Sequence, residues 1–398
     1  MEFYHDILEN LLDKLIDYRG KTPKKTLSGV PLVTAKIVKN GTINGYTEYI
    51  AEEDYDKWMV RGFPKVGDVI LTTEAPLGEV ALLKEEKVAL AQRIVCLRGK
   101  DNVLDNTYLK YYLQSGKGQK SLSARESGTT VTGIKQAELR RVDIEYPAYD
   151  DQCRIASILS SLDRKIELNN KINADLEEMA QAIFKNWFVD FEPFKDGKFV
   201  NSELGMIPEG WKVGTLGDIT KNKSAKVKER NDVKVLSPVT TGELVLSEEY
   251  FTKQVFSSSI AKYKIVNKGD FAYNPARVNI GSLGRNEFDF DGCVSPVYVV
   301  FSVLDGYENY FDLFRKTDFF KDSVASLAIG GVRQSLSYDD LSSIEVIIPS
   351  ENAVEEFNNL YNQMKKTIKA NKLENSRLSL LRDTLLPRLM SGELEVPE

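Results

Sequence analysis

The stretch LRRVDIEYPAYDDQCRIASILSSLD, residues 139–163, has the pattern of a short strand followed directly by a long helix. Apolar and polar residues alternate from Val142 to Tyr146, as in a half-buried strand, and Pro147 ends this pattern. Two acidic residues, Asp150 and Asp151, then precede a helical pattern that is clear from about Ile155 onward. The stretch therefore predicts a boundary between a globular domain and a helix.

The same boundary recurs 202 residues later, in LSSIEVIIPSENAVEEFNNLYNQMK at residues 341–365. Further matches lie at the same offset: KVGDVI at 65–70 corresponds to NKGDFA at 267–272, and SGTT at 127–130 corresponds to IGGV at 329–332. Matches spread over most of the chain indicate an internal repeat. We therefore expect two copies of one structural plan, related by a pseudo-twofold axis.

Each copy combines a region rich in strand and turn residues with a long helix, which predicts a mixed α+β (α/β) fold. The expected architecture is two similar globular domains joined by two long antiparallel coiled-coil helices. The segments are a first domain at 1–150, a central helix at 151–190, a linker at 191–209, a second domain at 210–349, a second helix at 350–386 and a C-terminal tail at 387–398.

Both predicted helices show a coiled-coil spacing of alternating three and four residues. The first series is Ile155, Ile158, Leu162, Lys165, Asn169, Ile172, Leu176, Met179 and Ile183; the second is Phe357, Leu360, Met364, Thr367, Asn371, Glu374, Leu378, Leu381 and Leu385. In an antiparallel pair the midpoint falls at Asn169 and Asn371, which we expect to approach each other and fix the register. The alternative is that both asparagines are solvated gaps in the seam.

The composition argues against several classes of function. The chain of 398 residues has one histidine, His5, three isolated cysteines and a net charge of −6. Histidine-based catalysis and most zinc sites therefore lack the residues they need. The sequence contains no run long and apolar enough to span a membrane and no secretory signal pattern, so we expect a cytoplasmic protein with no membrane partner.

Four segments of the chain resemble the specificity subunits of type I restriction–modification systems. They are RGKTP at 19–23, the block DDQCRIASILSSLDRKIELNNKINADLEEMAQAIFKNWFVDFEP at 151–193, GMIPEGWKVGTLGDI at 205–219 and LLPRLMSGELEV at 385–396. The central block is highly specific, and the resemblance extends over essentially the whole chain. One small departure is Cys153, which follows Asp151 and Gln152 just before the Arg-Ile pair of the helix.

The resemblance implies a non-catalytic subunit with two target-recognition domains that read a bipartite, asymmetric site on double-stranded DNA. It also implies partnership with two adenine-N6 methyltransferase subunits and with restriction subunits. Any S-adenosylmethionine, ATP and Mg²⁺ would then bind to those partners, and this chain would need no cofactor or metal of its own. The two helices would set the spacer between the half-sites and dock the methyltransferase subunits.

Basic, amide and hydroxyl side chains in glycine-rich loops are the candidates for DNA contact. In the first domain these are Lys21, Lys24, Lys25, Arg93, Arg125, Thr129, Thr130 and Lys135. In the second they are Lys223, Lys226, Lys228, Asn274, Arg277, Asn279, Arg285, Arg333, Gln334 and Ser335. Arg277 and Arg333 are the strongest candidates, because an arginine fork fits a guanine edge or a phosphate. For each residue the alternative is an ordinary solvated surface group.

Two other functions fit parts of the sequence. A coiled-coil adaptor with two protein-binding domains would have the same architecture but no basic face shared by its two domains. A self-contained methyltransferase or nuclease would need a DPPY-type loop, a phosphate-binding loop or a histidine cluster, and the sequence has none of these.

Overall fold

The computed structural model describes residues 2–18, 22–128, 132–327 and 335–396, which form two compact units. The first unit comprises residues 1–171 and 371–398, and the second comprises residues 172–370. Each unit therefore combines one globular domain with one half of each long helix.

The first unit is built on two four-stranded sheets. One has the order β2 (Leu12–Asp17), β11 (Ile94–Gly99), β8 (Val69–Thr73) and β9 (Leu77–Leu82), with all neighbours antiparallel. The other has the order β10 (Ala89–Leu90), β4 (Val30–Val33), β7 (Tyr49–Ile50) and β3 (Lys25–Thr26), and its β10–β4 pair is parallel. Two small ribbons complete the strands: β1 (Phe3–Ile7) with β12 (Asp143–Pro147), and β5 (Val38–Lys39) with β6 (Thr42–Ile43).

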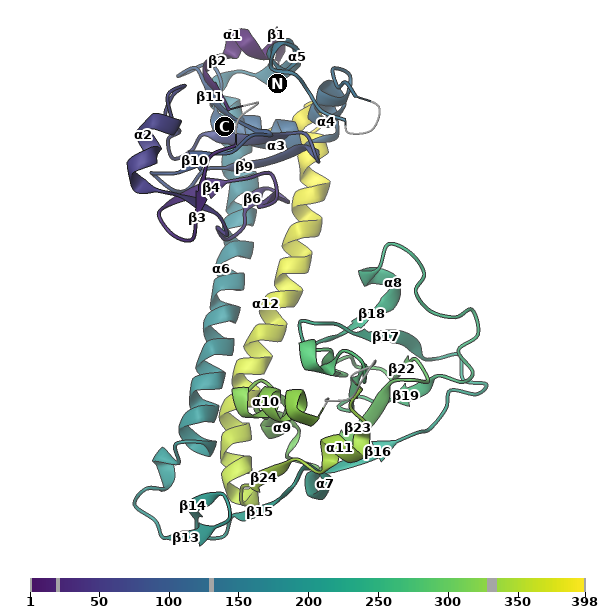
Figure 1. Ribbon diagram of the computed structural model, residues 1–398. Helices are drawn as coiled ribbons and strands as arrows, with labels where there is room; N and C mark the ends of the chain where they lie inside the picture. Colours follow the sequence, from purple (N-terminus) through teal and green to yellow (C-terminus); the bar gives the residue numbers. More distant parts are fainter. Residues whose placement is uncertain (1, 19–21, 129–131, 328–334, 397–398) are drawn as a thin grey trace. The chain divides into compact units, whose positions relative to one another are not determined.

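The core of this unit lies between the first sheet and the long helices, with α3 (Asn106–Gln114) in the middle (Figure 1). Tyr108 and Leu109 on α3 contribute to the same cluster of buried side chains as Leu159 on α6 (Tyr149–Phe188) and Leu389 on α12 (Glu351–Ser391). The shorter helices are α1 (Leu8–Leu11), α2 (Tyr55–Trp58), α4 (Gly116–Ser123) and α5 (Gln136–Arg140), with a 3₁₀ turn at Glu52–Asp54.

The second unit repeats this plan. Its first sheet has the order β16 (Thr220–Lys223), β23 (Val299–Val303), β20 (Phe271–Tyr273) and β21 (Leu283–Arg285). Its second sheet has the order β18 (Leu244–Leu246), β17 (Lys234–Pro238), β22 (Gly292–Val294) and β19 (Lys264–Val266), and its β17–β22 pair is parallel. The ribbons are β13 (Phe199–Ser202) with β14 (Gly205–Pro208), and β15 (Lys212–Thr215) with β24 (Glu345–Ile348).

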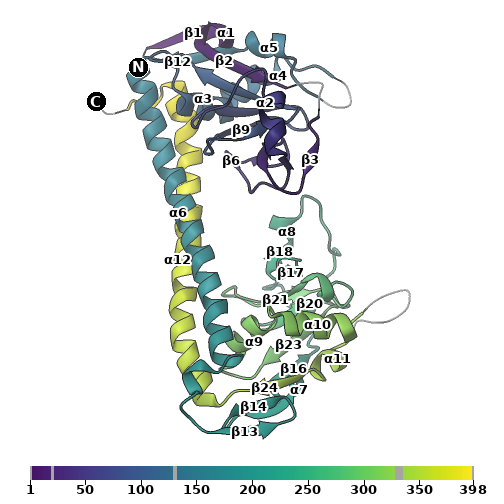
Figure 2. The same ribbon diagram turned by 60° about the vertical axis from the view of Figure 1, so that its left-hand side comes forward.

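Helix α9 (Glu308–Phe314) takes the place of α3 in this unit and lies between the sheet and the helix pair (Figure 2). Aromatic side chains dominate its core: Tyr310 on α9 contacts Phe184 and Phe188 on α6, and both of these contact Phe357 on α12. The shorter helices are α7 (Leu216–Ile219), α8 (Ser247–Tyr250), α10 (Asp318–Leu327) and α11 (Tyr338–Ser342), with 3₁₀ turns at Glu192–Phe194 and Val278–Ile280.

The internal repeat is confirmed in detail. Helix α5 and helix α11 occupy residues 136–140 and 338–342, and strands β12 and β24 begin at residues 143 and 345, so both pairs are 202 residues apart. A side-chain hydrogen bond repeats at the same offset: the hydroxyl of Tyr108 donates to the carbonyl oxygen of Glu145 at 2.9 Å, and that of Tyr310 donates to Ile347 at 2.7 Å. The two domains therefore share one packing frame.

The long helices are α6 (Tyr149–Phe188, 40 residues) and α12 (Glu351–Ser391, 41 residues). The predicted strand-to-helix boundary is confirmed: β12 ends at Pro147, and Asp150 and Asp151 lie in the first turn of α6. Helix α12 continues through Pro387, past the end predicted at residue 386. Burial of Leu389 and Met390 in the first core stabilises this last turn despite the proline.

The predicted coiled-coil seam is wrong at several positions. Met179, Leu360 and Leu381 were expected inside the seam, but their side chains are 51%, 43% and 46% exposed. On α6 the fully buried residues towards its end are Ala180, Phe184 and Phe188, at a spacing of four. The reason is that each helix also packs against its own domain, so its buried face follows the helical repeat of about 3.6 residues instead of a strict 3.5.

Asn169 occupies a buried position between α6 and α12 within the first unit. Its side-chain amide donates to a carboxylate oxygen of Glu374 at 2.7 Å and to the side-chain oxygen of Asn375 at 2.9 Å. These partners lie three and four residues beyond Asn371, the predicted partner, which takes part in an interaction of its own. Asn169 is therefore a bonded polar residue in this antiparallel helix pair and not a solvated gap.

Candidate nucleic-acid interface

In both domains the end of a central strand is joined to the end of a glycine-rich loop. In the first domain the Ile134 amide donates to the carbonyl oxygen of Thr73, the last residue of β8, at 2.9 Å. In the second, the Leu336 amide donates to Pro275, just after β20, at 3.1 Å. The two bonds are equivalent at an offset of 202 residues, so both copies hold a strand end and a loop end in one arrangement.

Several predicted residues of the first domain lie at this junction. Arg93 is exposed and forms an ion pair with Glu74 at 2.8 Å, and its carbonyl oxygen accepts a bond from the Thr73 amide. Gly133 forms β-bridges with both Glu74 and Ser127. Lys135 follows with an exposed side chain. Thr129 and Thr130 lie outside the described residues, as does Lys21.

The remaining candidates of the first domain differ in accessibility. Lys24 and Lys25 are exposed at β3, and Lys25 forms an ion pair with Glu48 at 2.7 Å. Arg125 is mostly buried and contacts Glu138 at 3.5 Å and Asp143 at 3.4 Å, which joins α4 to α5 and β12. The sequence could not reveal these acidic partners of Arg125, because they lie 13 and 18 residues away.

In the second domain, Asn274, Arg277 and Asn279 follow β20 in a compact turn. The Asn274 side-chain oxygen accepts a bond from the Ala276 amide at 3.1 Å, and its carbonyl oxygen accepts one from the Arg277 amide at 2.9 Å. The side chains of Arg277 and Asn279 are exposed, as is that of Ser335 at the described end of the glycine-rich loop. Arg333 and Gln334 lie outside the described residues. Lys226 and Lys228 are exposed on the segment that follows β16.

Two residues of the second domain that were predicted to contact DNA form contacts inside the domain. Lys223 forms an ion pair with Asp270 at 2.7 Å, and the Asp270 carboxylate is only 5% exposed. Arg285 donates to the side-chain oxygen of Asn309 at 2.9 Å and lies over the ring of Phe271. Lys223 is therefore neutralised within the domain, whereas Arg285 keeps its positive charge but has one N–H group engaged by Asn309.

The partner of Lys223 belongs to a turn that both copies share. Asp68 and Asp270 each accept a bond from the backbone amide three residues earlier, at 2.8 and 2.9 Å, and each follows a glycine with positive φ. Arg98 neutralises Asp68, whereas Lys223 neutralises Asp270. Burial raises the pKa of Asp270, and the nearby Lys223 opposes this effect. The repeated GD pair in the sequence is therefore a structural turn.

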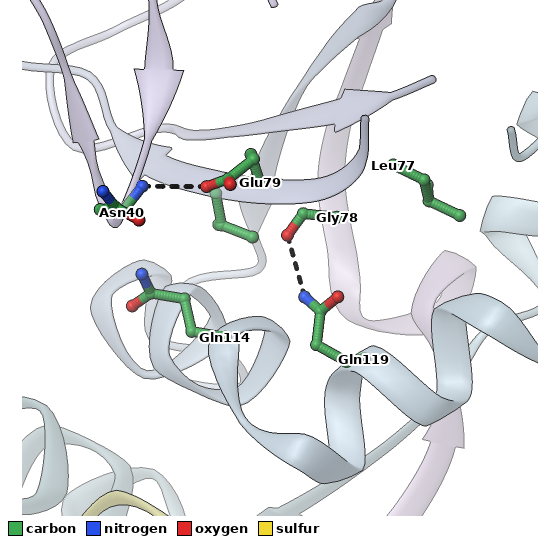
Figure 3. A pocket seen from close by; sticks show the side chains of 7 residues that line it. Asn40, Leu77, Gly78, Glu79, Gln114 and Gln119 are labelled. Atoms are coloured by element: carbon green, nitrogen blue, oxygen red, sulfur yellow. Dashed lines mark hydrogen bonds between the residues drawn. The ribbon is translucent and has the colours of Figure 1, made fainter. Parts of the chain in front are cut away.

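The first domain also contains a polar hollow of about 260 Å³ (Figure 3). It is lined by Asn40, Leu77, Gly78, Glu79, Val80, Gln114 and Gln119. The backbone amide of Asn40 donates to the Glu79 carboxylate at 2.9 Å, and the side-chain amide of Gln119 donates to the Gly78 carbonyl oxygen at 2.9 Å. Amide and carboxylate groups are the types that hydrogen-bond to base edges. The sequence does not reveal this hollow, because its lining residues come from four separate segments.

No helix within the described residues is long and apolar enough to cross a membrane. The same part of the chain contains no group of three or more histidine, cysteine, aspartate or glutamate side chains placed to hold a metal ion.

Comparison with known proteins finds similarity to DNA specificity proteins. Residues 13–178 match the family model described as the type I restriction modification DNA specificity domain. The chain is 29% identical to the type I restriction enzyme MjaIX specificity subunit of Methanocaldococcus jannaschii, over 95% of this chain and 91% of that protein. It is 26% identical to the HindI specificity subunit of Haemophilus influenzae, over 69% of this chain and 74% of that protein.

The fold also resembles a solved structure. The crystal structure of the S subunit of a type I restriction–modification system from M. genitalium matches with a TM-score of 0.60 and 18% identity, and the match covers 100% of this chain and 96% of that one. The expected architecture of two similar globular domains and two long helices is therefore confirmed.

Proposed function

Since this chain belongs to the specificity subunits of type I restriction–modification systems, we propose that each of its globular domains recognises one half of a bipartite DNA site. One observation supports this above all: equivalent hydrogen bonds from Ile134 and Leu336 fix the same strand–loop junction in both domains. The exposed side chains at the two junctions nevertheless differ. The two domains thus have the same backbone arrangement at this junction but different exposed side chains. This suits recognition of two different half-sites and hence of an asymmetric DNA sequence.

The chemistry of the exposed residues fits this role. In the second domain, the Arg277 guanidinium can form two parallel hydrogen bonds with a guanine edge, and the exposed Asn279 can bond to adenine. In the first domain, Lys135 supplies positive charge at the junction, and the exposed Arg93 would add to it on exchanging its partner Glu74 for a phosphate. The net charge of −6 is compatible with DNA binding if only these faces touch phosphates and the partner subunits supply further positive charge.

The long helices suit the role of a spacer. At about 1.5 Å per residue, the 40 residues of α6 give a rod of about 60 Å, longer than the ~34 Å of one turn of B-DNA. We infer that the helix length sets the number of base pairs between the two half-sites.

The same helices offer apolar surface for partner subunits. Leu168 on α6 and Leu373 and Leu380 on α12 are 52%, 54% and 70% exposed. Single exposed leucines are common on protein surfaces, so these three are candidate contact positions that substitution can test. We propose that two methyltransferase subunits dock on the helices and that restriction subunits join this complex. In this proposal the chain is not catalytic and binds no cofactor. S-adenosylmethionine, ATP and Mg²⁺ bind to the partner subunits.

Mapping of N6-methyladenine in DNA tests the proposal. Cells that express this chain with its methyltransferase subunit should show methylation at one bipartite motif with a fixed spacer. Cells that express the methyltransferase subunit alone are the control and should lack that motif. Methylation at a continuous motif, or an unchanged pattern when this chain is omitted, would contradict the proposal.

A further inference from the structure

A cluster of charged side chains joins three helices of the first unit at Asp163. One carboxylate oxygen of Asp163, on α6, accepts bonds from Lys110 on α3 at 2.8 Å and from the Tyr111 hydroxyl at 2.6 Å. The other accepts a bond from Arg382 on α12 at 2.9 Å. The recognition domain, α6 and α12 therefore meet at one carboxylate.

Lys110, Asp163 and Arg382 differ in how far they depend on this contact for charge neutralisation. The Lys110 side chain is 6% exposed, so burial lowers its pKa, and the ion pair with Asp163 opposes that effect. Asp163 and Arg382 are 26% and 28% exposed. Arg382 also contacts Asp383 on its own helix at 2.9 Å, and this second bond orients the guanidinium. Lys110 depends on Asp163 for neutralisation, whereas Arg382 retains a partner and some solvent without it.

The second copy shows what is specific to this cluster. At an offset of 202 residues, Lys110 corresponds to Asp312 and Asp163 corresponds to Lys365, so the charges are reversed. Lys365 lies close enough to contribute to the low pKa of Asp312. Arg382 corresponds to Ala180 on α6, which has no charge. The charges at these two positions thus recur with reversed sign, although Asp312 forms its ion pair with Arg315 and Lys365 forms its own with Glu287. The charged link to the other helix is present in one copy.

The charged residues of the cluster have two separate roles. The ion pair of Lys110 with Asp163 attaches the first domain to the helix that directly follows it in the chain, and the ion pair of Lys365 with Glu287 does so in the second. Arg382 adds a link from the first domain to α12, which comes from the distant end of the chain. Because Lys110 and Tyr111 already satisfy one oxygen of Asp163, the fold does not require Arg382 for charge neutralisation.

We propose that Arg382 is a positioning residue that ties the C-terminal part of α12 to the first recognition domain through Asp163 and so restricts the spacer lengths that the protein accepts. The inference rests on the proposed function. Without this link the domain would keep its attachment to α6 and its apolar contacts with Leu389 and Met390 near the end of α12. It could then tilt about these contacts, and its half-site could lie one base pair nearer or farther.

The test uses the full chain with its methyltransferase subunit and maps N6-methyladenine at single-base resolution. Arg382→Ala is compared with Arg377→Ala, which removes an exposed arginine from the same helix. We expect Arg382→Ala to keep both half-sites but to raise methylation at spacers one base pair shorter or longer at least tenfold. Arg377→Ala should match the wild type. Arg382→Lys, which can still reach Asp163, should restore most of the restriction.

The outcomes are distinguishable. An Arg382→Ala protein that folds and keeps a single spacer length overturns the inference while leaving the proposed function intact. Loss of methylation in Arg382→Ala at every site, with Arg382→Gln behaving as wild type, would show a role in stability only and also overturn it. A wild-type complex without a bipartite motif would overturn the proposed function and this inference together. Thermal unfolding of each purified complex confirms that the variants are folded.

Discussion

Asp312 on α9 and Arg315, which directly follows α9, form a buried ion pair with two bonds of 2.6 and 2.9 Å to the same carboxylate oxygen. Their side chains are only 7% and 9% exposed. Arg315 also donates to the Leu283 carbonyl oxygen at 2.8 Å, which joins α9 to β21. The pair therefore links the central helix of the second domain to the edge strand of its sheet.

This pair predicts a specific acid sensitivity. Burial alone would raise the pKa of Asp312, but Arg315, Lys316 and Lys365 lower it to about 2, below its ordinary value of 3.8. A carboxyl group with a lowered pKa in the folded state contributes stability above pH 3.8 and loses it as the pH falls towards 2. Asp312→Asn should be less stable than wild type at pH 7, and the difference should shrink between about pH 4 and pH 2. Urea unfolding at several pH values measures this; a constant difference would contradict it.

Arg277→Ala should weaken recognition of the second half-site alone. If the exposed guanidinium binds a guanine edge with two bonds, its loss costs about 1 to 3 kcal/mol of binding free energy. Binding to duplexes with either half-site altered measures the effect. Arg285→Ala is the contrasting variant: because Arg285 bonds to Asn309 within the domain, we expect a lower melting temperature in place of a sequence-specific loss. Equal loss at both half-sites in Arg277→Ala would argue against a base contact.

A change in helix length should change the spacer. Insertion of four residues, about one helical turn, at matched positions in α6 and α12 would lengthen the rod by about 6 Å, close to two base pairs of B-DNA. We expect methylation at the same half-sites with a longer spacer. Substitution of four exposed residues at the same places without insertion is the control. An unchanged spacer in the insertion variant would exclude the helices as the ruler.

Asn169→Ala should destabilise the first unit. The wild-type amide bonds to Glu374 and Asn375 in a buried position, and loss of buried hydrogen bonds of this kind costs about 1 to 3 kcal/mol. A double-mutant cycle with Asn375→Ala should show coupling, since the two residues share a bond. Additive effects on the free energy of unfolding would mean that this contact does not stabilise the helix pair. Asn170→Ala is not a neutral control, because Asn170 also bonds to Asn375.

Several features could be predicted from the sequence because they depend on local patterns. Alternating apolar residues, Pro147 and the acids after it mark the end of a strand and the start of a helix through backbone geometry and capping alone. The repeat also follows from the sequence, because equivalent positions such as Tyr108 and Tyr310 keep their spacing of 202 residues. Two domains and two long helices were therefore predictable.

Tertiary structure alone decided which polar residues are free and which are engaged. Lys223 and Arg277 look alike in the sequence, but Lys223 neutralises buried Asp270, 47 residues away, whereas Arg277 is exposed. The residues through which the two helices contact each other could not be predicted from the sequence either. Each helix buries one face on its partner helix and another on its domain. The partners of Asp163, at positions 110 and 382, show the physical reason: the free energy of a charged group depends on neighbours brought close by the fold, and spacing along the chain does not encode them.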